Sequence, residues 1–384
     1  MRVLLAFDKF KDSLTAPAAC ELAASALRAR QPDWSLDLCP LTDGGEGFAA
    51  ILTQAAGGET HTATVTGPRG APVAASFGLV KLHAIPAAAR TLLALPAELP
   101  ADATVALIEM ATASGLALLP AGERDPWQTT SRGTGELIAH AALLGAQVVL
   151  LGVGGSATND LGLGALGALG LRYLTADGRE ISPPVPATWA AIEQIEGRVA
   201  APLIRIACDV ANPLLGPQGC SAIYGPQKGL TAADLPRMEA LIGRLATRLC
   251  EQAGRPVDVM RAPGAGAAGG IAFGLMTAAG AQLLPGSVLV TAWLDLAHRL
   301  GRADLVITGE GRFDDSSLSG KGPGALARQA LTLAKPVHVF AGSIATSSAP
   351  AGLQLHAISP PTLPLAEALN AAPDLLARAV CTTF

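Results

Sequence analysis

The chain has 384 residues, of which half are apolar, 4% are aromatic and 15% are charged, and its formal net charge is −4. This length is enough for two or three domains with apolar cores. The acidic balance and the lack of basic runs argue against nucleic acid as a partner. The six cysteines form no CxxC pair, which is typical of reduced thiols in a cytoplasmic protein.

The first part of the chain alternates between apolar strands and helices. Residues 2–7 (RVLLAF) predict a strand that is buried on both faces, and Thr15 is the expected N-cap of the helix that follows. Residues 35–41 predict a second strand and residues 48–57 a second helix. This order favours parallel strands with a right-handed crossover. Asp8 interrupts the opening apolar run too early for a signal peptide.

The pattern changes near His61. Residues 61–80 alternate between apolar and polar side chains around a Gly-Pro-Arg-Gly turn, which predicts an antiparallel hairpin. Three more strands are expected, at residues 103–110, 146–153 and 203–210. Residues 262–294 carry no charge and are long enough to span a bilayer. Their prolines and glycines, and the lack of flanking aromatic belts, favour a buried helix instead and argue against a membrane protein.

Helices and apolar strands alternate again from about Pro285 to the end of the chain. The fold class is therefore α/β with two α/β domains. We predict a discontinuous Rossmann-like or flavodoxin-like domain with a parallel sheet, made of residues 1–61 and 286–384. Residues 62–285 would form an inserted mixed α/β domain that contains the hairpin and glycine-rich anion-binding loops.

Charged and polar residues follow nearly every predicted strand. In open parallel sheets, ligands bind beyond the carboxyl ends of the strands. A single aspartate after a strand is an ordinary turn residue. Six strand ends with such residues on one face, here called strand exits, predict a ligand-binding site. The residues at these exits are Asp8, Lys9, Lys11, Ser13, Asp43, Glu46, Ser156, Asn159, Asp160, Asp209, Asn212, Glu310, Arg312, Asp314 and Lys321.

These residue types suit transfer of a phosphoryl group. Carboxylates on one face repel each other unless a cation lies between them, and oxygen-rich sites suit Mg²⁺. Seven of the twenty residues from Leu151 to Gly170 are glycine, which lets backbone N–H groups approach a polyphosphate. Lysines can neutralise the anionic charge. The pattern therefore favours a kinase that uses a nucleoside triphosphate.

Two other functions stay open at this point. Residues 152–157 (GVGGSA) match a dinucleotide-binding GxGxxA pattern, but no acidic residue closes a strand about twenty positions later. An NAD(P)-dependent hydroxy-acid dehydrogenase therefore ranks below the kinase. A non-catalytic module that binds a small acid is the third alternative, without a DNA-binding or membrane segment to support it.

Several ordered motifs along nearly the whole chain resemble the type I family of bacterial glycerate kinases. They are FDKFKDSLTA (7–16), TDGGEG (42–47), GVGGSATNDLGLGALGALG (152–170), the CDVANP…GPQKG segment (208–229), PGAGAAGG (263–270) and DLVITGEGRFD with GKGPGALA (304–327). The resemblance implies two α/β domains, one interrupting the other. It also implies phosphorylation of D-glycerate by MgATP, to 2-phosphoglycerate or 3-phosphoglycerate.

We assign roles on this basis as hypotheses. The expected catalytic residues are Lys11, Asp43, Asp209 and Arg312. The expected ATP-binding residues are Asp8, Ser13, Gly154, Gly155, Ser156, Thr158, Asn159, Glu310 and Lys321. The expected Mg²⁺ ligands are Asp160, Glu310 and Asp314. Asp43 and Asp209 would contact the substrate hydroxyl, whereas Lys11 and Arg312 would neutralise the transferred group.

Other features leave details open. Lys228 is a weaker candidate, because a lone lysine in a turn is usually solvated. Phe48, Leu161 and Ser316 depart from the family motifs, so the substrate preference stays open. Assembly into a homo-oligomer is also an open alternative.

Overall fold

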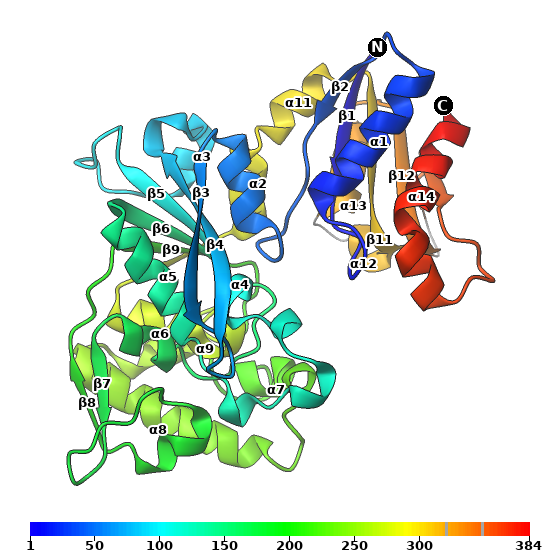
Figure 1. Ribbon diagram of the computed structural model, residues 1–384. Helices are drawn as coiled ribbons and strands as arrows, with labels where there is room; N and C mark the ends of the chain where they lie inside the picture. The colour runs from blue at the N-terminus through cyan, green and yellow to red at the C-terminus, as the bar shows by residue number, and fades with distance from the viewer. Residues whose placement is uncertain (319–321, 347–348) are drawn as a thin grey trace. The chain divides into compact units, whose positions relative to one another are not determined.

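The computed structural model describes residues 1–318, 322–346 and 349–384 (Figure 1). The chain separates into two compact units: unit 1 consists of Met1–Asp43 and Val290–Phe384, and unit 2 of Gly44–Leu289. Both are α/β, as predicted. Among these residues, no helix combines the length and the apolar character that a membrane span requires.

The centre of unit 1 is a parallel sheet with the strand order β13-β12-β11-β1-β2. Its strands are β1 (Arg2–Phe7), β2 (Ser35–Leu38), β11 (Leu305–Asp314), β12 (Val337–Ala345) and β13 (Leu353–Ala357). The apolar run in β1 is buried because this strand lies between β2 and β11, and Leu5 pairs with Ile307. The sheet therefore joins the two ends of the chain.

Helices cover both faces of this sheet (Figure 1). They are α1 (Ala16–Arg30), α11 (Leu296–Arg302), α12 (Asp315–Leu318), α13 (Gly322–Thr332) and α14 (Leu365–Thr383). Thr15 caps α1 as predicted, since its side chain accepts a hydrogen bond of 3.3 Å from the backbone N–H of Ala18. The buried face of α1 consists largely of alanines, which lets the helix pack closely against α14 and β1.

Unit 2 contains a mixed sheet with the order β10-β9-β6-β5-β4-β3. Its strands are β3 (Glu59–Thr66), β4 (Pro72–Lys81), β5 (Thr104–Glu109), β6 (Ala146–Gly152), β9 (Leu203–Ala207) and β10 (Gln282–Leu284). β3 and β4 form the predicted hairpin, and β4 is antiparallel to β5. The remaining neighbours are parallel. A small antiparallel pair consists of β7 (Leu171–Leu174) and β8 (Gln194–Gly197).

The helices of this part of the chain are α2 (Phe48–Ala55), α3 (Ala87–Leu92), α4 (Ala111–Ser114), α5 (Arg132–Leu143), α6 (Leu163–Ala168), α7 (Cys220–Tyr224), α8 (Leu235–Ala253), α9 (Ala267–Ala278) and α10 (Gly286–Trp293). α9 lies in the uncharged segment and is largely buried within the unit, as expected. Helix α2 packs on β3, β4 and β5. Contacts therefore place residues 44–61 in unit 2, whereas the sequence pattern grouped them with the first domain.

Candidate functional site

An acidic cluster lies at the carboxyl ends of β1 and β11 in unit 1. Asp8 follows β1, and its backbone N–H donates to the carbonyl oxygen of Gly309 at 2.9 Å. Because β1 and β11 are parallel neighbours in register, Asp8 lies beside Glu310, and Asp314 ends the same strand. Asp8, Glu310 and Asp314 are called the acid cluster below.

Glu310 has the most perturbed carboxyl group of the acid cluster. Its pKa is raised to about 7, chiefly by burial; the hydrogen bond with Ser317 opposes this shift, and the charges of Asp8 and Asp314 add to it. Its Oε1 atom is buried without a hydrogen-bond partner among the described residues. A buried acceptor without a donor is costly unless a ligand or cation completes its surroundings.

Asp314 has the opposite environment. The hydroxyl and backbone N–H of Ser316 donate to its Oδ1 atom at 2.5 and 3.0 Å, and Arg312 Nε lies 3.1 Å from Oδ2. These hydrogen bonds, chiefly the one from the Ser316 hydroxyl, lower the pKa of Asp314. Asp314 is thus held in its ionised form beside the more protonated Glu310.

Basic side chains surround this cluster. Lys9 Nζ lies 3.6 Å from Asp43 Oδ1, an ion pair that the sequence did not indicate. The Lys11 side chain is exposed. Its backbone lies against Gly311, where an added Cβ atom would be 3.2 Å from Lys11 N. The loop after β1 is therefore seated next to Glu310 and Arg312.

Ser13 and Lys321 are two further residues of unit 1 that the sequence predicted to bind ATP. The Ser13 hydroxyl donates to the backbone oxygen of Leu369 in α14 at 2.7 Å, which gives Ser13 an anchoring role. Lys321 lies outside the described residues.

The acid cluster suits a cation that keeps part of its water shell. Within the described ranges, no three acidic, histidine or cysteine side chains come close enough to form a complete metal cage. Mg²⁺ is commonly held by one or two carboxylates together with waters and substrate phosphates. The orphaned oxygen of Glu310 and the ionised Asp314 fit such a partial set of ligands.

The glycine segment, residues 151–170, leaves β6 in unit 2. Gly154 N donates to the carbonyl oxygen of Gly44 at 3.3 Å. A Cβ atom on Gly154 would lie 2.7 Å from the Cα atom of Gly45, so only glycine permits this approach. Gly155 has a φ of +71°, in the left-handed region that glycine favours. The bare backbone thus lets the segment pack directly on the loop that begins at Gly44.

Lys228 is buried beneath this segment rather than solvated, which corrects the expectation. Its side chain is 1% exposed, and Nζ donates to Ser156 Oγ at 2.9 Å and to the Thr158 carbonyl oxygen at 2.6 Å. Burial lowers its pKa to about 8. The lysine lies in a 3₁₀ turn between Gly225 and Gly229, and this flanking glycine pair was the signal of a tight, inward turn.

Thr158 and Asn159 are fully buried. Asn159 Nδ2 donates to Ser221 Oγ at 2.9 Å, which ties the segment to α7. Thr158 Oγ1 and Asn159 Oδ1 have no hydrogen-bond partner within the described part of the chain. Gly269 packs against the backbone of Thr158, since an added Cβ atom would lie 2.1 Å from its carbonyl oxygen. The glycine-rich stretch at residues 263–270 thus packs directly against the glycine segment.

Protein donors surround the carboxylate of Asp160, whose metal-ligand role stays a prediction. Its fully buried carboxylate accepts hydrogen bonds from the backbone N–H and hydroxyl of Ser131 at 2.7 and 2.8 Å. The backbone N–H groups of Gly162 and Gly164 donate to it at 3.2 and 3.3 Å. Burial raises its pKa, and these donors oppose that shift. The carboxylate connects the glycine segment to the start of α5.

Asp209 follows β9 and contacts the first turn of α10. The backbone N–H of Ser287 donates to Oδ2 at 2.9 Å, and the Ser287 hydroxyl donates to Oδ1 at 3.1 Å. This arrangement is typical of a carboxylate that caps a helix. Its predicted contact with the substrate hydroxyl stays a prediction.

The structure thus brings the predicted residues together in two groups. Unit 1 gathers Asp8, Lys11, Asp43, Glu310, Arg312 and Asp314 around the carboxyl ends of β1 and β11. Unit 2 gathers Gly154, Gly155, Ser156, Thr158, Asn159 and Asp160 in the glycine segment. That both groups act on one substrate stays a prediction.

Comparisons with known proteins identify the family. Residues 3–384 match the glycerate kinase family. The chain is 40% identical to glycerate 2-kinase of Escherichia coli (strain K12) over 348 residues, which cover 90% of this chain and 86% of the relative. It is 38% identical to glycerate kinase of Bacillus subtilis (strain 168), covering 98% and 95%. A crystal structure of the "putative glycerate kinase 2 from Salmonella typhimurium LT2" superposes with a TM-score of 0.76 at 38% identity, covering 100% of this chain and 98% of the other. The chain therefore belongs to the glycerate kinase family.

Proposed function

We propose that this protein transfers the γ-phosphoryl group of ATP to D-glycerate and forms 2-phosphoglycerate. Family membership and the name of the Escherichia coli relative, glycerate 2-kinase, support the substrate and the acceptor hydroxyl. The observation that carries the mechanism is the half-buried Glu310, whose Oε1 atom is buried and has no hydrogen-bond partner among the described residues, and which is set among other acids. Such a site is completed by a cation and a polyphosphate.

The reaction forms one bond and breaks one. The substrate hydroxyl oxygen attacks the γ-phosphorus, the bond from that phosphorus to the β–γ bridging oxygen breaks, and ADP leaves with the electron pair. A carboxylate accepts the hydroxyl proton. We favour Asp43 over Asp209 for this step, because both carboxylate oxygens of Asp209 already accept hydrogen bonds from Ser287.

Charge neutralisation would come from unit 1. Glu310 and Asp314 would hold Mg²⁺, which when bound offsets the charge of the phosphates. Lys11 and Arg312 would neutralise the group in transfer. Lys9 Nζ lies 3.6 Å from Asp43 Oδ1 and would orient that carboxylate.

Positioning would come from unit 2. The backbone N–H groups around Gly154 and Gly155 would face a phosphate or the carboxylate of glycerate. Ser156 would add a hydroxyl, whose position Lys228 fixes through the 2.9 Å hydrogen bond. All six cysteines are free thiols, which fits the proposed cytoplasmic location.

The test combines ADP release with identification of the product. The purified protein is incubated with MgATP and D-glycerate, and the proton-coupled phosphorus spectrum is recorded. We expect a doublet, because phosphate on the second carbon couples to one methine proton. A triplet would place the phosphate on the third carbon. Absence of glycerate-dependent ADP release would overturn the proposal.

A matched pair of variants connects the assay to the acid cluster. We expect Glu310→Gln to raise the Mg²⁺ concentration needed for half-maximal rate by about 10-fold to 100-fold. The control is Glu21→Gln, which changes an exposed glutamate on α1 of the same unit. An equal Mg²⁺ requirement in both variants would remove Glu310 from the cation site.

A further inference from the structure

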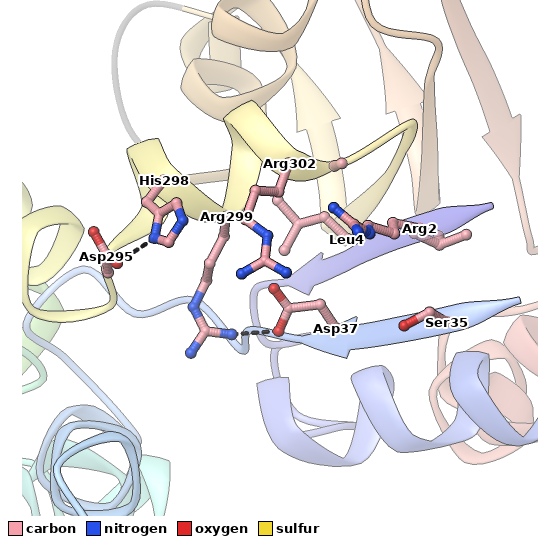
Figure 2. Close-up of a pocket in the computed structure, with 10 residues that line it drawn as sticks. Arg2, Leu4, Ser35, Asp37, Asp295, His298, Arg299 and Arg302 are labelled. Atoms are coloured by element: carbon pink, nitrogen blue, oxygen red, sulfur yellow. Dashed lines mark hydrogen bonds and ion pairs between the residues drawn. The ribbon is translucent and has the colours of Figure 1, made fainter.

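A polar pocket lies in unit 1 where β1 and β2 begin, beside α11 (Figure 2). Its volume is about 390 Å³, which is within the range of small-molecule sites. The polar side chains that line it include Arg2, Ser35, Asp37, His298, Arg299 and Arg302. The proposed catalytic function does not use any of these residues.

The pocket is separate from the acid cluster. Arg2 begins β1, whereas Asp8 follows its end. At about 3.3 Å per residue, the strand puts these two positions roughly 20 Å apart. The pocket lies at the amino-terminal ends of the parallel strands, opposite the edge where ligands of such sheets usually bind. It is therefore not a part of the acid cluster.

The charges in this pocket are only partly neutralised. Arg299 forms an ion pair with Asp37, and its Nε also donates to the Leu294 carbonyl oxygen at 2.9 Å. His298 Nδ1 lies 3.1 Å from Asp295 Oδ2 (Figure 2). The guanidinium groups of Arg2 and Arg302 have no hydrogen-bond or ion-pair partner among the described residues. Two unpaired cations thus line one pocket in a protein with a net charge of −4.

The helix dipole explains only a part of this cluster. Arg299 and Arg302 lie in the last turn of α11, where cations interact favourably with the exposed carbonyl groups. Arg2 comes from a strand, so this effect does not account for its presence in the pocket. The ion pair with Asp37 fixes Arg299 against β2, and Figure 2 shows the side chains of Arg299 and Arg302 extending from α11 toward the strands. Arg299 is thus held by protein partners, whereas Arg2 and Arg302 keep N–H donors without a partner among the described residues.

We propose that this pocket binds a small anion that carries a phosphate group. Guanidinium groups match phosphate oxygens with paired N–H donors, and they stay protonated at all physiological pH values. Arg2 and Arg302 would supply these donors, with the Ser35 hydroxyl as a further one. The volume leaves room for inorganic pyrophosphate or a small organic phosphate.

The test uses His298 as a local reporter, because binding at the acid cluster would not act directly on its ring. The ring C–H signals of the six histidines are recorded by NMR, and the His298 signal is assigned by its loss in His298→Gln. Inorganic pyrophosphate is then titrated at constant ionic strength without Mg²⁺ or nucleotide. We expect a saturable shift of the His298 signal, and at least tenfold weaker binding in Arg302→Ala and in Arg2→Ala.

The matched control is Arg30→Ala, which removes an arginine from the last turn of α1 in the same unit. It should bind like the unmodified protein. The proposal is overturned if the His298 signal shows no saturable shift, if Arg302→Ala binds normally, or if Arg30→Ala weakens binding equally. Tighter binding of citrate than of pyrophosphate would overturn the assignment to phosphate. None of these readouts depends on kinase activity, so the result is independent of the proposed function.

Discussion

The acid cluster of unit 1 and the glycine segment of unit 2 differ in charge and in how their polar atoms are hydrogen-bonded. The acid cluster concentrates charge, and the buried Oε1 atom of Glu310 has no hydrogen-bond partner within the described ranges of the chain. The polar groups of the glycine segment are largely occupied, because Lys228 donates to Ser156 and Thr158, and Ser131 donates to Asp160. The contrast underlies our proposal that unit 1 supplies charge for the reaction and unit 2 a fixed backbone shape. Substitutions should therefore affect activity in one unit and stability in the other.

The largest effect is expected for Lys11→Ala in unit 1. Loss of the ammonium group should lower kcat at saturating MgATP and glycerate by about 10²-fold to 10³-fold, because the transferred charge loses a neutralising partner. The unfolding temperature should stay unchanged, since this side chain is exposed. The control is Lys81→Ala, which alters a lysine on β4. Nearly normal kcat for Lys11→Ala would remove this residue from the site.

Asp160→Asn in unit 2 should lower stability, whereas Lys11→Ala should lower kcat. The new amide group would face donors that now bind a buried carboxylate, so we expect the free energy of unfolding to fall by about 3 kcal/mol. Urea denaturation measures this change. If unfolding is unaffected but the Mg²⁺ requirement rises, Asp160 is a metal ligand and its structural assignment fails.

Gly154→Ala tests the close approach inside unit 2. The added methyl group would meet the Cα atom of Gly45 at 2.7 Å and push the two loops apart. We expect the free energy of unfolding to fall by about 2 kcal/mol. Gly122→Ala is a matched control, since no atom lies within 4 Å of its added Cβ. Equal stability of both variants would show that the contact at Gly154 is not restrictive.

The smallest effect concerns a titration in unit 1 outside the acid cluster. His338 on β12 lies 3.0 Å from His356 on β13, and burial, with a smaller effect of His356, lowers its pKa to about 4. An unfolded histidine has a pKa of about 6.5, so the unfolded chain binds more protons between these values. The contribution of His338 to the free energy of unfolding should therefore be fully present above about pH 6.5 and should be lost as the pH falls toward 4.

His338→Gln should flatten this pH dependence. The unfolding temperature is measured at several pH values from 7 to 5, with the exposed His83→Gln as control. A slope that is the same in all three proteins would assign the acid sensitivity to other groups.

Much of the fold followed from local patterns in the sequence. The apolar run of β1, the N-cap at Thr15 and the β3–β4 hairpin depend on neighbouring residues, and the structure confirms each of them. The ordered motifs also indicated the family correctly.

The remaining features depend on distant partners. Lys228 was expected in solvent because its acceptors, Ser156 and Thr158, lie about 70 positions earlier. The hydrogen bonds from Ser131 to Asp160 were not anticipated, because Ser131 lies 29 positions earlier, directly before α5. The sequence pattern grouped helix α2 with the first domain, whereas α2 packs on β3, β4 and β5. An amphipathic pattern predicts a helix with one buried face, but it does not predict which sheet that face will contact.

The pairing of β1 with β11 has a consequence for biosynthesis. The hydrogen bond from Thr308 to the Ala6 carbonyl oxygen joins residues 302 positions apart. At about 5–20 residues per second, a ribosome needs roughly 15–60 s to make the chain between them. Gly44–Leu289 is continuous and is complete before β11 emerges. During translation, β1 therefore lacks the strand that covers one of its edges in the folded protein until β11 has been made.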